Sequence, residues 1–282
     1  MTLPDFLYIG PPRSASTWLY EVLRAHPRVF VPRGKDIYFF DRYFARGQDW
    51  YEARFAGADR GHLAVGDISH DYLYSALAAT RIRATIPGAR LLAMLRNPFD
   101  RALSDYRYVA QWSAGRVSFA QALDRHPTII SNGLYAGPLG VYFDLFGRER
   151  VHVMIYDDLR DDPERVARGM LEFLGVGFCE GLPVHGRANV SAESRAPWLT
   201  ALARRLAQGA RDMGFSEAVG RLKYSPLRRA LFRPATAPPP VDEESLARMR
   251  ESFLPDIDAL EALIGRDLSG WKAQGGRAAR TA

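Results

Sequence analysis

The chain has 282 residues, 47% of them hydrophobic and 25% charged, a composition that can bury one large α/β core in a single domain. Its single cysteine, Cys179, excludes an intrachain disulfide and a multi-cysteine metal site, and we expect it to act as a small buried hydrophobic residue. The net charge of +6 favours anionic partners, but it does not indicate nucleic acid.

The start of the chain and the length of its apolar runs indicate where in the cell we expect the protein. The first predicted strand begins about six residues into the chain, so we expect no signal peptide. No apolar run reaches the roughly 18 residues that a membrane span requires. Together with the single cysteine, these features predict a soluble, cytoplasmic protein. Only three of the 38 basic residues are lysines, a bias that we interpret as codon usage.

The most informative segment spans residues 8–18, which read Tyr-Ile-Gly-Pro-Pro-Arg-Ser-Ala-Ser-Thr-Trp. The pattern predicts an apolar strand, a tight loop of small residues and the start of a helix. An anion at this helix start would meet unpaired backbone N–H groups and the positive end of the helix dipole. It would also meet the hydroxyls between residues 14 and 17 and the Arg13 cation. We therefore predict a phosphate-binding loop.

This loop does not follow the Walker pattern of nucleoside triphosphatases. Counting from Gly10, Ala15 stands where the second glycine belongs, and Ser16 stands where the lysine belongs. The basic group lies earlier, at Arg13, although the arginine bias of the chain offers an alternative reason for that residue.

A second segment follows the apolar run at residues 90–95, which predicts a buried strand. Arg96 stands at the end of this strand, and Pro98 is suited to the first turn of a helix. Ser104 comes about two helical turns after Arg96, so a guanidinium and a hydroxyl can converge on one phosphate. The alternative for Arg96 is a surface ion pair with Asp100 or Asp105.

A third segment reads Val-His-Val-Met-Ile-Tyr-Asp-Asp-Leu over residues 151–159, followed by Pro163 and by Phe-Leu-Gly at residues 173–175. It predicts a buried strand, an acidic turn, and a helix that begins at Pro163 and ends before Gly175. In this order the three segments resemble sulfotransferases that use 3′-phosphoadenosine 5′-phosphosulfate (PAPS), over about residues 6–195. The motifs are most similar to those of heparan-sulfate-type and cytosolic sulfotransferases.

The resemblance implies a fold class and a cofactor. The fold is α/β, with a P-loop-like, mostly parallel sheet flanked by helices and PAPS at the carboxyl ends of its strands. The resemblance implies a bacterial member of the family that needs no metal. Trp18 matches an adenine-stacking tryptophan, with core packing as the alternative. The residues implied in binding PAPS or its product PAP are Arg13, Ser14, Ala15, Ser16, Thr17, Trp18, Arg96, Ser104, Arg187 and Asn189.

Two further segments supply candidate catalytic residues. Residues 35–41 resemble the KExxFF motif of the glycan enzymes, in which the lysine lies near the transferred sulfuryl group and the carboxylate is the general base. This implies catalytic roles for Lys35 and Asp36, with Arg13 as a further cation. The alternative is a turn of solvated charges before an aromatic helix. His70 competes with Asp36 as base, because cytosolic sulfotransferases carry a catalytic histidine in the comparable stretch and the unperturbed pKa of histidine lies near neutrality.

The C-terminal third has fewer motifs. Residues 201–211 and 241–263 have helical apolar spacing, and the proline-rich residues 233–240 predict an extended linker. The basic residues between 221 and 233 could bind an acidic acceptor, although a solvated face is the simpler interpretation. We predict one sulfotransferase domain over residues 1–271, with a core at 6–195, a helical, lid-like part at 196–271 and a disordered tail at 272–282.

The predicted reaction is transfer of a sulfuryl group from PAPS to a hydroxyl or amine of a small molecule or glycan. Two alternatives remain open at this point. A small-molecule kinase would share the phosphate loop but is expected to carry a Walker-type lysine. A non-catalytic nucleotide-binding protein would tolerate loss of Lys35, Asp36 and His70, all of which are present.

Overall fold

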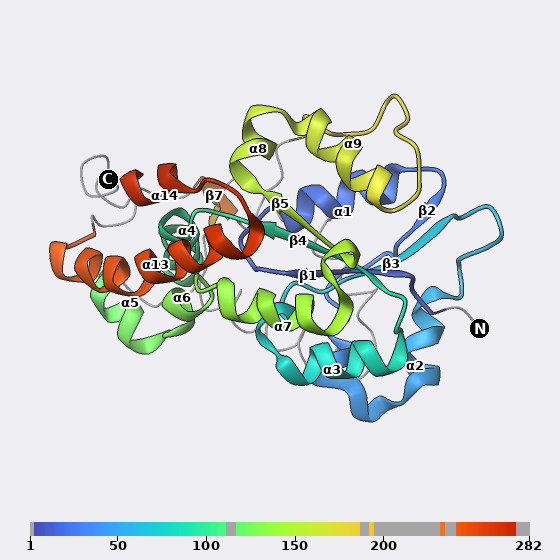
Figure 1. Ribbon diagram of the computed structural model, residues 1–282, viewed down its shortest axis with the longest axis horizontal. Helices are drawn as coiled ribbons and strands as arrows, with labels where there is room; N and C mark the ends of the chain where they lie inside the picture. The colour runs from blue at the N-terminus through green and yellow to red at the C-terminus, as the bar shows by residue number, and fades with distance from the viewer. Residues whose placement is uncertain (1–2, 111–116, 187–191, 195–231, 235–240, 275–282) are drawn as a thin grey trace. The chain divides into compact units, whose positions relative to one another are not determined.

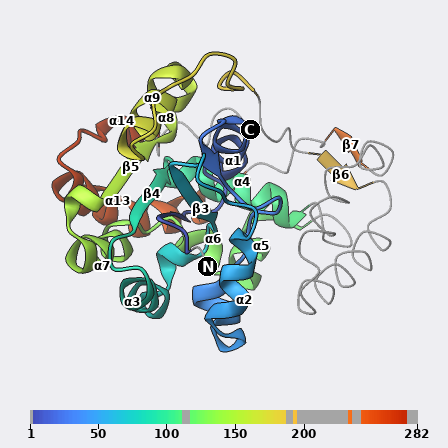
Figure 2. The same cartoon turned by 90° about the vertical axis from the view of Figure 1, so that its right-hand side faces the viewer.

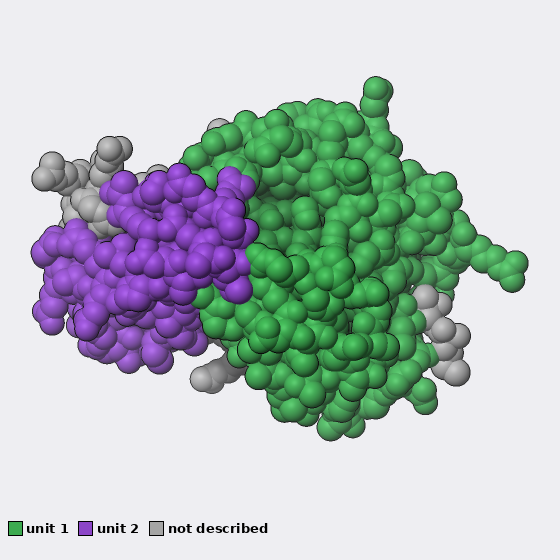
Figure 3. Space-filling model, viewed as in Figure 1, with its two compact units in different colours: residues 1–96, 135–188 green, residues 97–134, 189–282 purple. Residues whose placement is uncertain are grey.

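The computed structural model describes residues 3–110, 117–186, 192–194, 232–234 and 241–274. Its contacts divide the chain into two compact units, coloured separately in Figure 3. Unit 1 contains residues 1–96 and 135–188, and unit 2 contains residues 97–134 and 189–282.

Unit 1 is built on a five-stranded, wholly parallel sheet (Figure 1). The spatial order is β2-β3-β1-β4-β5, so β1 lies in the centre and pairs with both β3 and β4. This arrangement confirms the predicted fold class. The central strands are buried along their length, as expected for a parallel sheet covered on both faces. The strands are β1 (Phe6–Gly10), β2 (Val29–Phe30), β3 (Ala64–Ile68), β4 (Arg90–Leu95) and β5 (Val151–Ile155).

Helices cover both faces of this sheet. In Figure 1, α1, α8 and α9 lie above the strands, and α2, α3 and α7 lie below them. The upper core contains Leu19 and Leu23 from α1 packed with Met170 and Leu171 from α9. The helices are α1 (Ser16–Ala25), α2 (Gln48–Glu52), α3 (Ala76–Thr85), α7 (Ala136–Phe146), α8 (Tyr156–Asp161) and α9 (Pro163–Phe173). Short helical turns are η1 (Phe39–Tyr43), η2 (Phe44–Arg46), η3 (Ala53–Phe55), η4 (Tyr72–Tyr74) and η5 (Arg148–Arg150).

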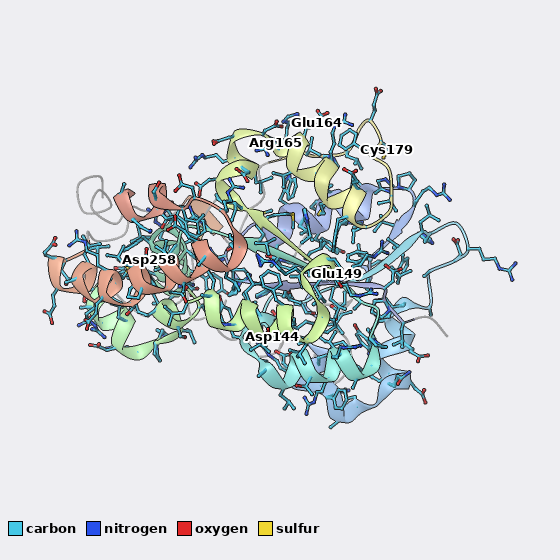
Figure 4. The ribbon with its side chains drawn as sticks, viewed as in Figure 1. Asp144, Glu149, Glu164, Arg165, Cys179 and Asp258 are labelled. Atoms are coloured by element: carbon cyan, nitrogen blue, oxygen red, sulfur yellow. The ribbon has the colours of Figure 1, made fainter. Side chains whose placement is uncertain are left out.

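The third sequence segment folds with one difference from expectation. The strand and the helix from Pro163 form as predicted, but α8 replaces the predicted acidic turn. Asp157 and Asp158 lie in the first turn of α8, where negative charge favours a helix N-terminus. Cys179, labelled in Figure 4, is partly buried and packs against the core that α1 and α9 share. Its side chain is therefore less enclosed than we expected.

Unit 2 is helical, with one antiparallel pair of short strands that Figure 2 shows side by side. Phe99 of α4 meets Phe253 of α13 edge-to-face, with ring centroids 5.2 Å apart. Asp242 caps α13 by accepting the Ser245 N–H at 2.8 Å. The elements are α4 (Pro98–Ala110), α5 (Phe119–Arg125), α6 (Thr128–Ser131), β6 (Ala192–Ser194), β7 (Phe232–Pro234), α13 (Glu243–Ile264) and α14 (Ser269–Gln274).

The structure confirms one expectation for the C-terminal third of the chain and corrects others. Helix α13 confirms the predicted helix at residues 241–263. Helix α14 extends through Gln274, so residues 272–274 of the predicted tail are helical, and Lys272 forms ion pairs with Asp258 and Glu261. The first residues of the predicted linker belong to β7. The predicted helix at residues 201–211, the rest of the linker and residues 275–282 lie outside the described residues. Within the described part of the chain, no helix combines the length and the apolar character that crossing a bilayer requires.

Candidate active site

The predicted phosphate loop connects β1 to α1 at the carboxyl edge of the sheet. Arg13 and Ala15 have left-handed backbone conformations, with φ angles of 66° and 57°. Such conformations cost a non-glycine residue about 1 kcal/mol or more, and they turn successive backbone N–H groups toward one point. Ser14, between them, is fully buried, and its Oγ has no hydrogen-bond partner among the described residues. A buried hydroxyl beside a concave row of N–H groups fits an anionic oxygen.

Arg96 contacts this loop directly. It follows β4, the strand beside β1, and its guanidinium donates to the carbonyl of Arg13 at 3.2 Å. The guanidinium also lies over the Tyr156 ring, 4.6 Å from its centroid, and the Nε atom is buried without a partner in the described chain. The Arg96 carbonyl accepts the Tyr135 hydroxyl at 2.8 Å. These contacts fix an arginine with spare hydrogen-bonding capacity at the edge of the phosphate loop.

The sequence left open a surface ion pair of Arg96 with Asp100 or Asp105. Asp105 does not form this pair. Asp105 instead pairs with Arg101, which is fully buried, at 3.2 Å. Ser104 lies on α4, in unit 2, and its joint role with Arg96 stays a prediction.

Lys35 reaches the phosphate loop from a segment 18 to 19 residues away in sequence. Its Nζ donates to Ser16 Oγ at 3.0 Å and to Thr17 Oγ1 at 3.2 Å. Both hydroxyls belong to the first turn of α1. The structure therefore adds a second cation to the helix start, at the place where the sequence predicts one.

The two candidate bases are hydrogen-bonded to each other. His70 Nδ1 lies 2.8 Å from Asp36 Oδ1, and the two side chains are 21% and 13% exposed. The Tyr38 hydroxyl lies 3.0 Å from Nε2 and 3.4 Å from Nδ1 of the same imidazole, and Asp71 Oδ1 lies 3.5 Å from Nε2. Asp36 and His70 are thus members of one cluster rather than alternatives in separate places.

Tyr38 is a member of this cluster that the sequence did not single out. The Arg42 guanidinium lies over its ring, 4.0 Å from the centroid, and burial raises the pKa of its phenol well above the usual value. The hydroxyl therefore stays protonated and can donate to His70. Its place two residues after Asp36 is the only sequence signal for this role.

Gly10 allows the phosphate loop to lie close to the Asp36–His70 pair. It has a φ of 126°, and a Cβ atom there would lie 2.1 Å from the carbonyl oxygen of His70. Only glycine allows this approach of β1 to the residue that carries the imidazole.

Trp18 has the surroundings that the core-packing alternative predicts. Its ring is 4% exposed and lies in the core between α1 and the sheet, and its Nε1 donates to the Val184 carbonyl at 2.7 Å. A buried ring with its polar atom engaged is what core packing requires, and the adenine-stacking role stays a prediction. Arg187 and Asn189 lie outside the described residues.

Comparison with known proteins identifies the class. The model of the sulfotransferase domain family matches residues 3–193, which is more than half of the chain. The chain therefore belongs to the sulfotransferase domain family, as the sequence motifs predicted.

Individual relatives are similar at lower coverage. The chain is 32% identical over 114 residues to the membrane-associated sulfotransferase kil1 of Dictyostelium discoideum, covering 40% of this chain and 24% of that protein. It is 29% identical over 181 residues to heparan sulfate glucosamine 3-O-sulfotransferase 6 of Homo sapiens, covering 61% and 52%. The crystal structure of a sulfotransferase from Alicyclobacillus acidocaldarius has 26% identity and a TM-score of 0.68, covering 96% of this chain and all of that one. This chain thus spans about a quarter and about half of the two curated relatives.

Proposed function

We propose that this protein transfers a sulfuryl group from PAPS to a hydroxyl or amine of a small-molecule or glycan acceptor and releases PAP. The observation that carries the proposal is the contact of Lys35 Nζ with Ser16 and Thr17, next to the Asp36–His70 pair. One side of this arrangement suits a donor with a growing negative charge, and the other suits an acceptor that must lose a proton. The family membership of the chain supports the same reaction.

The residues of the phosphate loop fit the donor. The buried Ser14 hydroxyl and the left-handed turn at residues 13–15 provide donors for phosphate or sulfate oxygens. When bound, PAPS supplies an activated sulfuryl group whose departure leaves negative charge on a phosphate oxygen. Lys35, Arg13, Ser16 and Thr17 are the residues that we assign to stabilising this charge. Arg96, with its unused Nε, is assigned to a phosphate of the nucleotide.

The Asp36–His70 pair is assigned to the acceptor. Asp36 accepts the proton of the attacking hydroxyl, and His70 Nδ1 holds the carboxylate in place. The Tyr38 hydroxyl contacts the same imidazole at Nε2 and is assigned to holding the ring in place. A kinase is not favoured, because the cation of the loop is not at the Walker position. A cytoplasmic site of action is part of this proposal, because the single cysteine requires no oxidising compartment.

The test is a mass-spectrometric screen for the gain of one sulfo group, with PAPS, a panel of phenols, alcohols, amines and glycans, and a metal chelator present. The wild type should modify at least one acceptor class, and Lys35→Ala should abolish the gain. Lys272→Ala is the matched control, because Lys272 is also a paired lysine but belongs to unit 2. Transfer of phosphate from ATP, or no transfer from PAPS to any acceptor, would overturn the proposal.

A further inference from the structure

A buried carboxylate lies directly behind the catalytic segment. Asp67 belongs to β3 and is fully buried, and it accepts three hydroxyl hydrogen bonds. The donors are Ser69 Oγ at 2.7 Å, Tyr72 OH at 2.9 Å and Tyr51 OH at 3.0 Å. Burial raises the pKa of Asp67 to about 6, which the three donated hydrogen bonds partly oppose.

Ser69 connects this carboxylate to the catalytic segment. Its Oγ accepts the backbone N–H of Tyr38 at 3.1 Å while donating its own hydrogen to Asp67. A hydroxyl has one hydrogen, so its donation to Asp67 leaves the lone pairs of Oγ for the Tyr38 N–H. A second backbone bond runs from the Asp36 N–H to the Ile68 carbonyl at 2.7 Å. The end of β3 thus holds residues 36 and 38 by their main chain.

The held backbone has an unfavourable conformation. Asp36 and Tyr38 have φ angles of 71° and 54°, so two non-glycine residues within three positions are left-handed. Each costs about 1 to 2 kcal/mol, and such a conformation persists only where surrounding contacts fix it. The two bonds to the end of β3 are contacts of this kind, and the conformation that they fix places Lys35 on Ser16 and Asp36 on His70.

We propose that Ser69, oriented by the buried Asp67, is a positioning residue that fixes residues 35–38 for sulfuryl transfer. This rests on the proposed function for its kinetic consequence, but not for its structural one. Ser69 touches neither reacting group: it acts on Asp36 and Lys35 through the backbone of Tyr38. Removal of its hydroxyl should therefore loosen the Asp36–His70 contact and leave the phosphate loop intact.

The test compares Ser69→Ala with Tyr51→Phe. Both variants remove one hydroxyl that donates to Asp67. Within the described part of the chain, however, Tyr51 forms no hydrogen bond to the backbone of residues 35–38, so it serves as the matched control. Ser69→Ala should lower kcat about 10- to 100-fold, with PAP affinity within threefold of wild type by calorimetry. Tyr51→Phe should keep kcat within threefold. Equal losses of kcat in the two variants would show that any disturbance of Asp67 has the same effect, and would overturn the proposal.

A second readout is independent of turnover. In proton NMR of the full chain, the ring N–H of His70 bonded to Asp36 should give a downfield signal that is retained in Tyr51→Phe and lost in Ser69→Ala. An unchanged His70 signal in Ser69→Ala would overturn the proposal. If the wild type transfers no sulfuryl group to any acceptor, the proposed function fails, while this signal still decides the positioning role of Ser69.

Discussion

The carboxylate of Asp36 and the imidazole of His70 lie 2.8 Å apart and form one hydrogen-bonded unit. The sequence offered them as competing general bases, one from a glycan-enzyme pattern and one from a cytosolic pattern. In the structure both imidazole nitrogens have neighbours, Asp36 on Nδ1 and Tyr38 on Nε2. This arrangement favours Asp36 as the group that accepts the proton, and His70 as the group that holds the Asp36 carboxylate in place.

Replacement of Asp36 by asparagine should therefore be more damaging than replacement of His70. Asp36→Asn should lower kcat by about 10² to 10⁴, the usual effect of removing a general base, because an amide cannot accept the proton. His70→Asn should lose less. Initial rates at saturating PAPS check both values.

The control for this comparison is a second Asp–His pair. Asp59 Oδ1 lies 2.9 Å from His62 Nδ1, in the exposed turn that precedes β3. Asp59→Asn should leave kcat unchanged, because this turn is at the opposite end of the strand from the site. If His70→Asn is the less active of the two site variants, the assignment of base and positioning group is reversed.

Lys35→Ala should lower turnover far more than it lowers nucleotide affinity. The charge on the leaving oxygen is fully developed only in the transition state, so a cation that serves it acts on the chemical step. We expect a kcat reduced by at least about 100-fold and a PAP dissociation constant raised by less than about tenfold. Single-turnover kinetics and calorimetry separate the two. A normal kcat with weak PAP binding would remove Lys35 from the catalytic step.

Arg96→Ala should weaken PAP binding by about 30- to 150-fold, which corresponds to about 2 to 3 kcal/mol for a charge-assisted contact. ADP, which has no 3′-phosphate, should be affected much less if Arg96 binds that group. Arg150→Ala is the control, because Arg150 is an exposed arginine that donates to the Gly88 carbonyl away from the site. Calorimetry with both nucleotides gives the comparison, and equal losses for PAP and ADP would place Arg96 elsewhere on the nucleotide.

The Asp67 carboxyl should make the free energy of unfolding depend on pH below about pH 6. Burial raises the pKa of Asp67 to about 6 in the folded protein, whereas an aspartate in the unfolded chain has the ordinary value of 3.8. Between these two pH values the folded state therefore binds more protons than the unfolded state. Its contribution to the free energy of unfolding is therefore largest below about pH 4 and falls as the pH rises to about 6. Urea unfolding across this range should show this component in the wild type and lose it in Asp67→Asn. An identical pH dependence in the two proteins would contradict the raised pKa.

Much of the fold was predictable because its signals are local. The apolar run at residues 90–95 matches β4, and Pro98 begins α4, because a buried parallel strand and a helix start both leave continuous patterns. Lys35 was predictable because lysine is rare in this chain and stands beside an acidic residue and two aromatic residues. The grouping of residues 97–134 with α13 and α14 was not, because it depends on contacts such as that of Phe99 with Phe253.

The sequence pointed to several residues that the structure brings together at the candidate site, but not to their arrangement. Nothing in the spacing of Asp36 and His70 indicates that they touch, since the contact arises when residues 36–38 bond to the end of β3. Tyr38 and Asp67 were missed for the same reason. Nothing in the residue type marks either position, and each residue acquires its role from contacts that form only in the folded chain.

The close approach of Gly10 to the His70 carbonyl has a consequence for how this site can diversify. The spacing between the phosphate loop and the Asp36–His70 pair is set by two stretches of main chain in contact. Side chains that select an acceptor can therefore be exchanged around Asp36 while that spacing stays constant. A side chain at position 10 would instead meet the main chain of His70 and push the phosphate loop away from the Asp36–His70 pair, whatever the acceptor is.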